Sequence, residues 1–393
     1  MPVKSTSLRY VGRLLGSAAL LILPSQAWAQ QPTDSLAAEA RVVDAVCAKQ
    51  VVVLGELPSH GESRAFQAKA RIVERLVERC GFDALLFEAP VYEFVGFREA
   101  VAQGRAAPAQ LDRAIGRFWW TRELAGWRRW LFHRATAGGL VLGGLDDQAG
   151  GATSDHALAT LPGLVAAWSP AGSASECEQA VARNLHWRYD EAGQRFDEPE
   201  RIRLQRCARA AADALAARAG RGAATPERVM AENLASYYDR QRGSPGARDR
   251  DEAMYRNLLW HRERMSRDAK IIVWTATVHA ARLQGGRPEK PLGARLAEQW
   301  GDRLAVIGFT ALGGRSSMAG MPSRPLPDAP PGSLEALATG SGAAAAFLDA
   351  SALRRIGTVP SRLLGRFTSA DWSDYFDGVV VFREEVAPTF EKW

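Results

Sequence analysis

Val51-Val-Val-Leu-Gly-Glu56 opens the part of the chain that decides the fold, and Ala84-Leu-Leu-Phe-Glu88 closes it. Both runs are short and apolar, which is typical of buried parallel strands and not of strands with one solvated face. Between them, residues 62–79 place apolar side chains at helical spacing, and Gly81 ends that helix. The stretch therefore predicts a strand, a crossover helix and a second parallel strand.

Similar runs recur outward from this unit, at 140–146, 271–276, 304–310 and 378–382. Helices are expected over 91–103 and 122–136, and the Gly-, Pro- and Ser-rich residues 313–331 are expected to form a loop. Residues 155–267 contain no strand-like run and are rich in Ala, Arg, Glu and Leu. The sequence thus predicts an α/β fold with a mostly parallel sheet flanked by helices, interrupted by an inserted helical region at about 155–267.

The N-terminus has the order of a secretory signal peptide. Lys4, Arg9 and Arg13 precede the apolar stretch 14–23, and Ala27-Trp-Ala29 supplies small residues for cleavage after Ala29. The apolar stretch is too short to span a bilayer, so we expect no stable membrane insertion. Residues 30–393 are then a periplasmic or secreted domain.

Charge and motifs exclude several classes of protein. The formal net charge of +6 is small, half of it belongs to the expected leader, and Arg alternates with acidic residues, so we expect no nucleic-acid partner. The sequence contains no nucleophile-elbow serine motif, dinucleotide fingerprint, Walker loop or HExxH helix. A serine-triad hydrolase and a nucleotide enzyme are therefore not expected. We also expect no cofactor.

Four cysteines are compatible with disulfides in an oxidising compartment. Cys47 and Cys80 precede successive strands at one sheet edge, and Cys177 and Cys207 fall on two successive helical segments. These positions suggest those two pairs, although the sequence alone does not fix connectivity.

Polar residues stand where the predicted strands end. Glu56, Glu88 and Asp146 end three strands, His60 follows in the first loop, and His279 follows the strand at 271–276. Ligand sites in open α/β folds lie at these carboxyl ends. An imidazole oriented by a carboxylate can take a proton from water, which predicts hydrolysis without a covalent intermediate. A single Glu after a strand could instead cap the next helix.

The residues resemble, in order, those of the erythromycin esterase family. The resemblance rests on Gly55-Glu56, His60-Gly61, Phe66, Lys69, Arg71, Gly81-Phe82, Glu88, Trp120-Thr-Arg-Glu123, Gly144-Leu-Asp146 with Gln148, Arg250-Asp251 with Met254 and Asn257, Trp274 with His279, and Gly308-Phe309. Together these matches cover most of the chain after residue 29.

The resemblance implies cleavage of macrolide lactones, and hence a response to antibiotic, in a deep cleft by water and without a metal. It makes His60 the general base, Glu56 and Glu88 the groups that orient the water or His60, and His279 a contact to the substrate or oxyanion. The small-molecule ester or lactone would be bound by Lys69, Asp146, Trp120 and Arg250. Arg250 could instead tie the helical insertion to the core, and the Trp cluster around Trp120 could be core packing. The oligomeric state is not predicted.

Two positions depart from the family pattern. Glu56 and His60 are four residues apart where the family has three, so the loop containing Pro58 must bulge. Ala276 stands where the family has the first His of its later motif. Because the base and the carboxylates are kept, hydrolysis of an ester or amide other than a macrolide stays open. Two alternatives also stay open: a metal-dependent hydrolase using the same Glu and His residues, and a catalytically silent binding protein.

Overall fold

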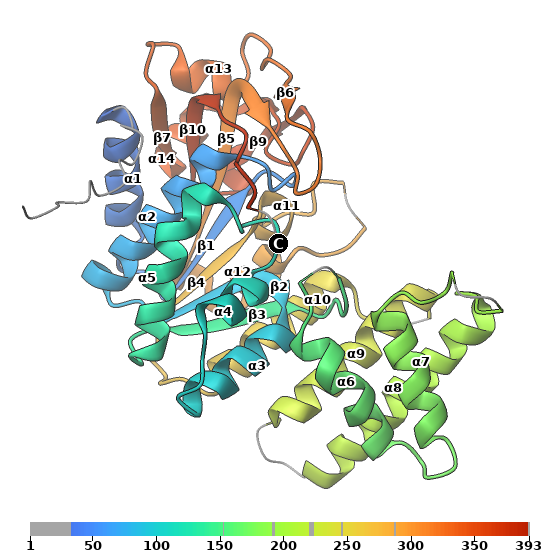
Figure 1. Cartoon of the computed structure of the whole chain (residues 1–393). Helices are drawn as coiled ribbons and strands as arrows, with labels where there is room; N and C mark the ends of the chain where they lie inside the picture. The colour runs from blue at the N-terminus through green and yellow to red at the C-terminus, as the bar shows by residue number, and fades with distance from the viewer. Residues whose placement is uncertain are drawn as a thin grey trace, which may run out of the picture. The chain divides into compact units, whose positions relative to one another are not determined.

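The computed structural model describes residues 33–151, 153–190, 193–219, 224–244, 247–286 and 288–391. The expected signal peptide at 1–29 lies outside this range. Within it, none of the helices has the length and apolar character needed to cross a membrane. Figure 1 shows strands at the centre of the fold, with α6 to α9 gathered at one side.

Eight strands in the described residues form one sheet, in the order β3-β2-β4-β1-β5-β10-β7, with β6 added to the end of β5. Their bounds are β1 (Val51–Glu56), β2 (Ala84–Pro90), β3 (Val141–Asp146), β4 (Ile271–Ala276), β5 (Leu304–Ser316), β6 (Arg324–Leu326), β7 (Ala345–Asp349) and β10 (Gly378–Glu385). The five pairings from β3 to β10 are parallel, whereas β7 and β6 pair antiparallel. Glu56 lies beside Ala276 in the register of β1 with β4.

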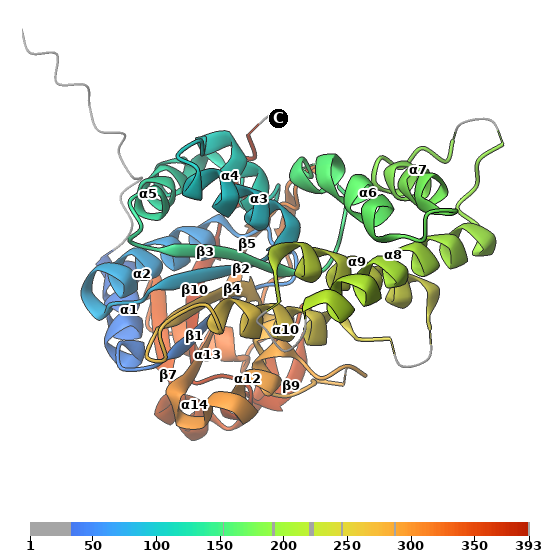
Figure 2. The same ribbon diagram turned by 90° about the horizontal axis from the view of Figure 1, so that it is seen from below.

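Side-chain alternation along each strand builds a separate core on each face of the sheet. Val52 and Leu54 pack into one cluster, whereas Val51 and Val53 pack into the other. The first face is covered by α1 (Thr33–Val46), α2 (Ser63–Cys80), α4 (Pro108–Ile115) and α5 (Ala125–Thr136). The second is covered by α10 (Arg250–Arg262), α12 (Leu292–Trp300), α13 (Leu334–Thr339) and α14 (Ala350–Ile356). Figure 2 shows the sheet between these helical layers.

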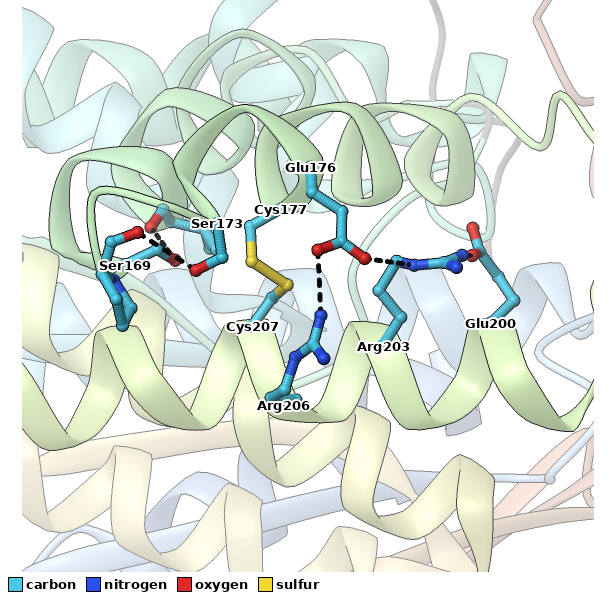
Figure 3. Close-up of a disulfide and its surroundings, with 10 residues drawn as sticks. Ser169, Ser173, Glu176, Cys177, Glu200, Arg203, Arg206 and Cys207 are labelled. Carbon is cyan, nitrogen blue, oxygen red and sulfur yellow. Dashed lines mark hydrogen bonds and ion pairs between the residues drawn. A yellow bond between two sulfur atoms is a disulfide. The ribbon is translucent and has the colours of Figure 1, made fainter.

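The chain between β3 and β4 forms five helices among its described residues. They are α6 (His156–Trp168), α7 (Ala174–Leu185), α8 (Glu198–Ala219), α9 (Pro226–Arg242) and α10. The first four share an apolar core of their own, to which α3 (Val91–Ala102) contributes Tyr92. The disulfide Cys177–Cys207 joins α7 to α8 beside ion pairs of Glu176 with Arg203 and Arg206 (Figure 3).

The predicted α/β class with a mostly parallel sheet is confirmed, and so are both suggested disulfides, Cys47–Cys80 and Cys177–Cys207. The loop prediction for residues 313–331 is wrong in part. β5 continues to Ser316, and β6 pairs with its end. Gly314 permits this because its φ of 111° suits glycine and a Cβ there would collide with the backbone of Glu385.

The helix expected over 122–136 begins with the 3₁₀ turn Arg122–Leu124 and continues as α5. Several short elements were not predicted: α11 (Thr277–Ala280), β8 (Thr358–Ser361), β9 (Thr368–Asp371) and the 3₁₀ turns Gly301–Arg303 and Trp372–Asp374. β8 and β9 form a two-stranded hairpin of their own. Such short, partly polar segments carry no clear periodicity.

Candidate active site

The strand-end carboxylates Glu56 and Glu88 point to opposite faces of the sheet. Glu56 follows the alternation of Val52 and Leu54, so it faces α2, whereas Glu88 lies in phase with Leu86 and faces α10 and α11. β4 separates their strands. The site is therefore built across the carboxyl end of β4, with one carboxylate on each side.

Glu56 is a fully buried carboxylate that accepts three hydrogen bonds. Its Oε1 accepts from His60 Nδ1 at 2.9 Å and from Trp119 Nε1 at 2.9 Å, and its Oε2 accepts from Lys69 Nζ. Burial raises the pKa of Glu56, but Lys69 and His60 outweigh burial and hold that pKa below its usual value. An ionised Glu56 fixes the proton of neutral His60 on Nδ1, which leaves Nε2 as the basic nitrogen.

His60 reaches Glu56 through a tight turn. Its backbone N–H donates to the Leu57 carbonyl at 3.0 Å, and its φ of 47° is left-handed. This turn accommodates the four-residue spacing that the sequence showed. The ring stacks on Phe118 with centroids 4.9 Å apart. Burial lowers the pKa of His60, but the carboxylates of Glu88 and Glu56 raise it above 6.5.

Lys69, on the second turn of α2, is a buried ammonium. Besides Glu56 it contacts the Thr275 carbonyl at 3.3 Å and the ring of Trp274, 4.2 Å from its centroid. Burial lowers the pKa of Lys69 to about 8, since it disfavours the charge more than Glu56 favours it. Lys69 therefore binds one carboxylate oxygen of Glu56 while His60 binds the other, so Glu56 links the two side chains.

Glu88 joins the two halves of the site. Its Oε2 accepts from Thr275 Oγ1 and from the Ala276 backbone N–H, each at 2.8 Å. Its Oε1 lies 3.0 Å from Arg250 Nη2, 3.3 Å from His279 Nε2 and 3.8 Å from His60 Nε2. Burial raises the pKa of Glu88, but His279 and Arg250 outweigh burial and hold it well below its usual value.

Arg250 and His279 carry positive charge on the Glu88 side of the site. Arg250, at the start of α10, binds Asp146 through Nη2 at 2.6 Å, and its Nη1 lies 3.1 Å from His279 Nε2. His279 Nδ1 pairs with Asp251 Oδ1 at 2.8 Å. Burial lowers the pKa of His279, but Glu88 and Asp251 raise it overall to about 9. With that pKa, His279 is charged at neutral pH.

The structure thus gathers seven of the eight sequence-derived candidates: Glu56, His60, Lys69, Glu88, Asp146, Arg250 and His279. Trp120 is half-buried, and its neighbour Trp119 is the one that contacts Glu56. Sequence reasoning also missed Asp251 as the partner of His279. Its position beside Arg250 in the first turn of α10 was the available signal.

The donor set bears on the metal hypothesis. Within the described parts of the chain, no group of three or more His, Cys, Asp or Glu side chains could hold a metal ion. Where Glu88 and Asp146 converge, their oxygens bind the guanidinium of Arg250. A protein cation therefore already neutralises the carboxylates that a metal would need.

Solved structures with low sequence identity share this fold. A Bacillus cereus protein has a TM-score of 0.67 and 17% identity, covering 90% of this chain and 92% of its own. A succinoglycan biosynthesis protein has a TM-score of 0.68 and 16% identity, covering 89% and 92%. A mutant of erythromycin esterase EreC in its open conformation has a TM-score of 0.60 and 15% identity, covering 90% and 94%.

Comparison with family models assigns most of the chain to one family, although comparison with curated proteins does not. None of the curated proteins matches it significantly. The family model for erythromycin esterase, however, matches residues 77–385, a range that contains Glu88, Arg250 and His279. This chain therefore belongs to the erythromycin esterase family.

Proposed function

We propose that this protein is an exported hydrolase that cleaves an ester or lactone with a water molecule activated by His60. One observation carries the proposal: the Nδ1 of His60 is held by Glu56 at 2.9 Å while its Nε2 faces Glu88 at 3.8 Å. Export is supported by the residue order at the N-terminus and by two disulfides, which persist in oxidising compartments.

The first step is attack by water on the ester carbonyl. A water molecule lying off the line between His60 Nε2 and Glu88 Oε1 can bond to both atoms at about 2.8 Å. His60 takes one proton from this water as its oxygen bonds to the carbonyl carbon. The carbonyl electron pair moves onto its oxygen, giving a tetrahedral oxyanion.

The second step is collapse of that intermediate. The oxyanion re-forms the carbonyl and expels the alkoxide, which takes the proton from His60 to leave as an alcohol. Arg250 Nη1 and the charged His279 lie beside Glu88 and would stabilise the oxyanion. The products are an acid and an alcohol, and the enzyme returns to its starting protonation state.

Two other functions make different predictions. A metal-dependent hydrolase would need Arg250 to leave Glu88 and Asp146, and its turnover would be abolished by a chelator. If the protein is instead a silent binding protein, the wild type and the His60→Ala variant would bind ligands with similar affinity, and neither would show turnover. The buried Glu56–His60 pair favours the hydrolase over the binding protein, because isolating such groups from water is costly without a use.

The experiment is to incubate the purified mature chain with macrolides, simple lactones and simple esters, with and without chelator. Mass spectrometry would detect the addition of one water to a lactone, or the acid and alcohol released from an ester. We expect chelator-resistant turnover of at least one class. Chelator-sensitive turnover would favour the metal enzyme, and no turnover with measurable binding would favour the binding protein.

A further inference from the structure

A hollow lies at the same edge of the sheet as the Glu88 cluster, against the loop that precedes His60. It is a cavity of about 600 Å³ between that loop, the end of β5 with β6, and the tip of the β8–β9 hairpin. Leu57, Pro58 and Ser59, the three residues before His60, form one wall. The cluster around Glu88 lies toward β4 and β2, whereas this cavity lies toward β5. The loop that carries His60 therefore forms a wall of this cavity.

The cavity combines apolar side chains with arginines that have no direct ion pair. Leu57, Leu326 and Phe367 contribute apolar surface, and Arg324, Arg362 and Arg366 contribute three guanidinium groups. None of these three arginines forms an ion pair with a carboxylate in the described part of the chain, although Glu335, Asp328 and Glu62 act on Arg362 through space.

Arg362 is the arginine of this cavity that the surrounding structure holds in place. It is 4% exposed, its Nη2 donates to the carbonyls of Leu312 and Pro327, and its guanidinium lies 4.6 Å from the centroid of the Phe367 ring. Its Nε is buried without a hydrogen-bond partner. Carbonyls and an aromatic ring fix the group, and the carboxylates of Glu335, Asp328 and Glu62 act on its charge only through space. A buried arginine in this state is a ready partner for an anionic ligand.

Resting on the proposed function, we propose that this cavity binds the carboxylate-bearing part of an ester substrate. The apolar wall would take the carbon chain or ring, and the arginines would bind the carboxylate. Arg324 and Arg366 are exposed lining residues that would contact the carboxylate from the solvent side, whereas Arg362 is a buried lining residue. The substrate class is therefore an ester that carries a free carboxylate besides the bond that is cleaved.

Binding can be tested apart from turnover in the His60→Ala background. The probes are monophenyl glutarate and its neutral methyl ester, and calorimetry measures both affinities. We expect the anion to bind about tenfold or more tightly than the neutral ester. Adding Arg324→Ala and Arg366→Ala should remove most of that preference. Arg129→Ala, on an exposed part of α5, is the matched control and should keep it.

Equal affinities for the two probes, or a preference unchanged by the double substitution, would overturn the assignment of the cavity. Turnover by the wild type is read separately, so a retained anion preference without turnover would reject only the hydrolase proposal. In active protein, comparing monophenyl glutarate with 4-carboxyphenyl butyrate tells whether the carboxylate belongs to the acyl or the alcohol part. If the Arg324→Ala, Arg366→Ala variant no longer prefers either carboxylate-bearing ester over its neutral methyl ester, the result would support binding of the carboxylate in this cavity.

Discussion

His60 owes its position to the residues on either side of it. The Ser59 hydroxyl donates to Glu62 Oε1 at 2.5 Å, and the Gly61 N–H donates to Glu62 Oε2 at 2.9 Å. These bonds brace a turn in which His60 adopts a left-handed φ, a conformation uncommon outside glycine. The imidazole is thereby aimed before substrate arrives, which reduces the ordering that catalysis requires.

Replacing Glu56 with Gln should change both the rate and its pH dependence. Glu56 raises the pKa of His60, so the acidic limb of the kcat/KM profile should move to lower pH when the charge is removed. The looser imidazole should also lower kcat by about 10- to 100-fold. Stopped-flow or steady-state assays from pH 5 to 10 would measure both effects. Glu99→Gln, exposed on α3, is the control, and a limb that stays in place would contradict this role for Glu56.

The wild-type profile itself should be bell-shaped. His60 acts as a base only when neutral, and because its pKa is raised, activity should fall as the pH drops through a value above 6.5. His279 helps only when charged, so activity should fall again as the pH rises through about 9. His279→Gln should therefore lose the alkaline limb as well as part of the rate. An alkaline limb that persists unchanged in this variant would assign it to another group, such as Lys69.

The sequence predicted those site residues that end a strand or follow one closely. Glu56, Glu88 and Asp146 share that rule, and parallel pairing brings them to one edge. The choice of Trp119 over Trp120 could not be predicted, because two adjacent aromatic residues in an irregular segment give no orientation. Likewise, the contact of Asp251 with His279 depends on how α10 packs, which local sequence does not specify.

At the scale of elements, α2 links the site to the far end of β10. Glu385 Oε1 accepts from the Arg64 backbone N–H at 2.5 Å and Oε2 accepts from that of Ala65 at 3.3 Å. It thus caps the first turn of the helix that carries Lys69. We expect Glu385→Ala to lower the free energy of unfolding by about 1–2 kcal/mol. Urea titration would measure it, and an unchanged midpoint would contradict the cap.

The protonation of Glu385 adds a pH dependence to that stability. Burial, together with the nearby Glu62, raises its pKa from 4.5 to about 8. Between these values the folded protein holds a proton that the unfolded chain has released, so this group makes stability fall as pH rises from 4.5 to 8. Glu385→Gln should remove that contribution. Urea midpoints of wild type and Glu385→Gln that run parallel over this range would contradict the raised pKa.

Strands were easier to predict than the pieces that close the site. β1, β2 and β4 are uninterrupted apolar runs, which only a buried strand or helix explains. β6 has the sequence Arg-Pro-Leu, and β8 the sequence Thr-Val-Pro-Ser, and each is held by pairing with a distant segment or a hairpin partner. Such strands form because of tertiary contacts, so they cannot be predicted from their own residues.

At the scale of the whole molecule, the helices between β3 and β4 have their own core and their own disulfide. The Cys177–Cys207 bond closes a loop with a separation of 30 residues, which the chain-entropy model values at about 3–4 kcal/mol. Cys177→Ser with Cys207→Ser should destabilise α7 and α8 first. Hydrogen exchange should then speed up in these helices before it does in β1 and β4. Equal protection in both proteins would contradict a local role.

The α/β class was predictable because every parallel strand lies between two apolar layers, and that leaves a continuous apolar run in the sequence. The path of the chain between β3 and β4 was not, because helical periodicity shows which face is buried without showing against what. In the structure, three side chains of α10 fix this helix against the sheet. Arg250 binds Asp146, Asp251 binds His279, and Asn257 donates to the Leu145 carbonyl.

The most direct test of the account is kcat/KM of the metal-stripped protein and of its His60→Ala variant, on the best ester or lactone found. We predict that the wild type keeps its activity after chelation, and that His60→Ala loses about 10²- to 10⁴-fold while remaining folded. Equal activity of the two proteins, or activity that vanishes on chelation and returns with a divalent metal, would contradict water activation by His60.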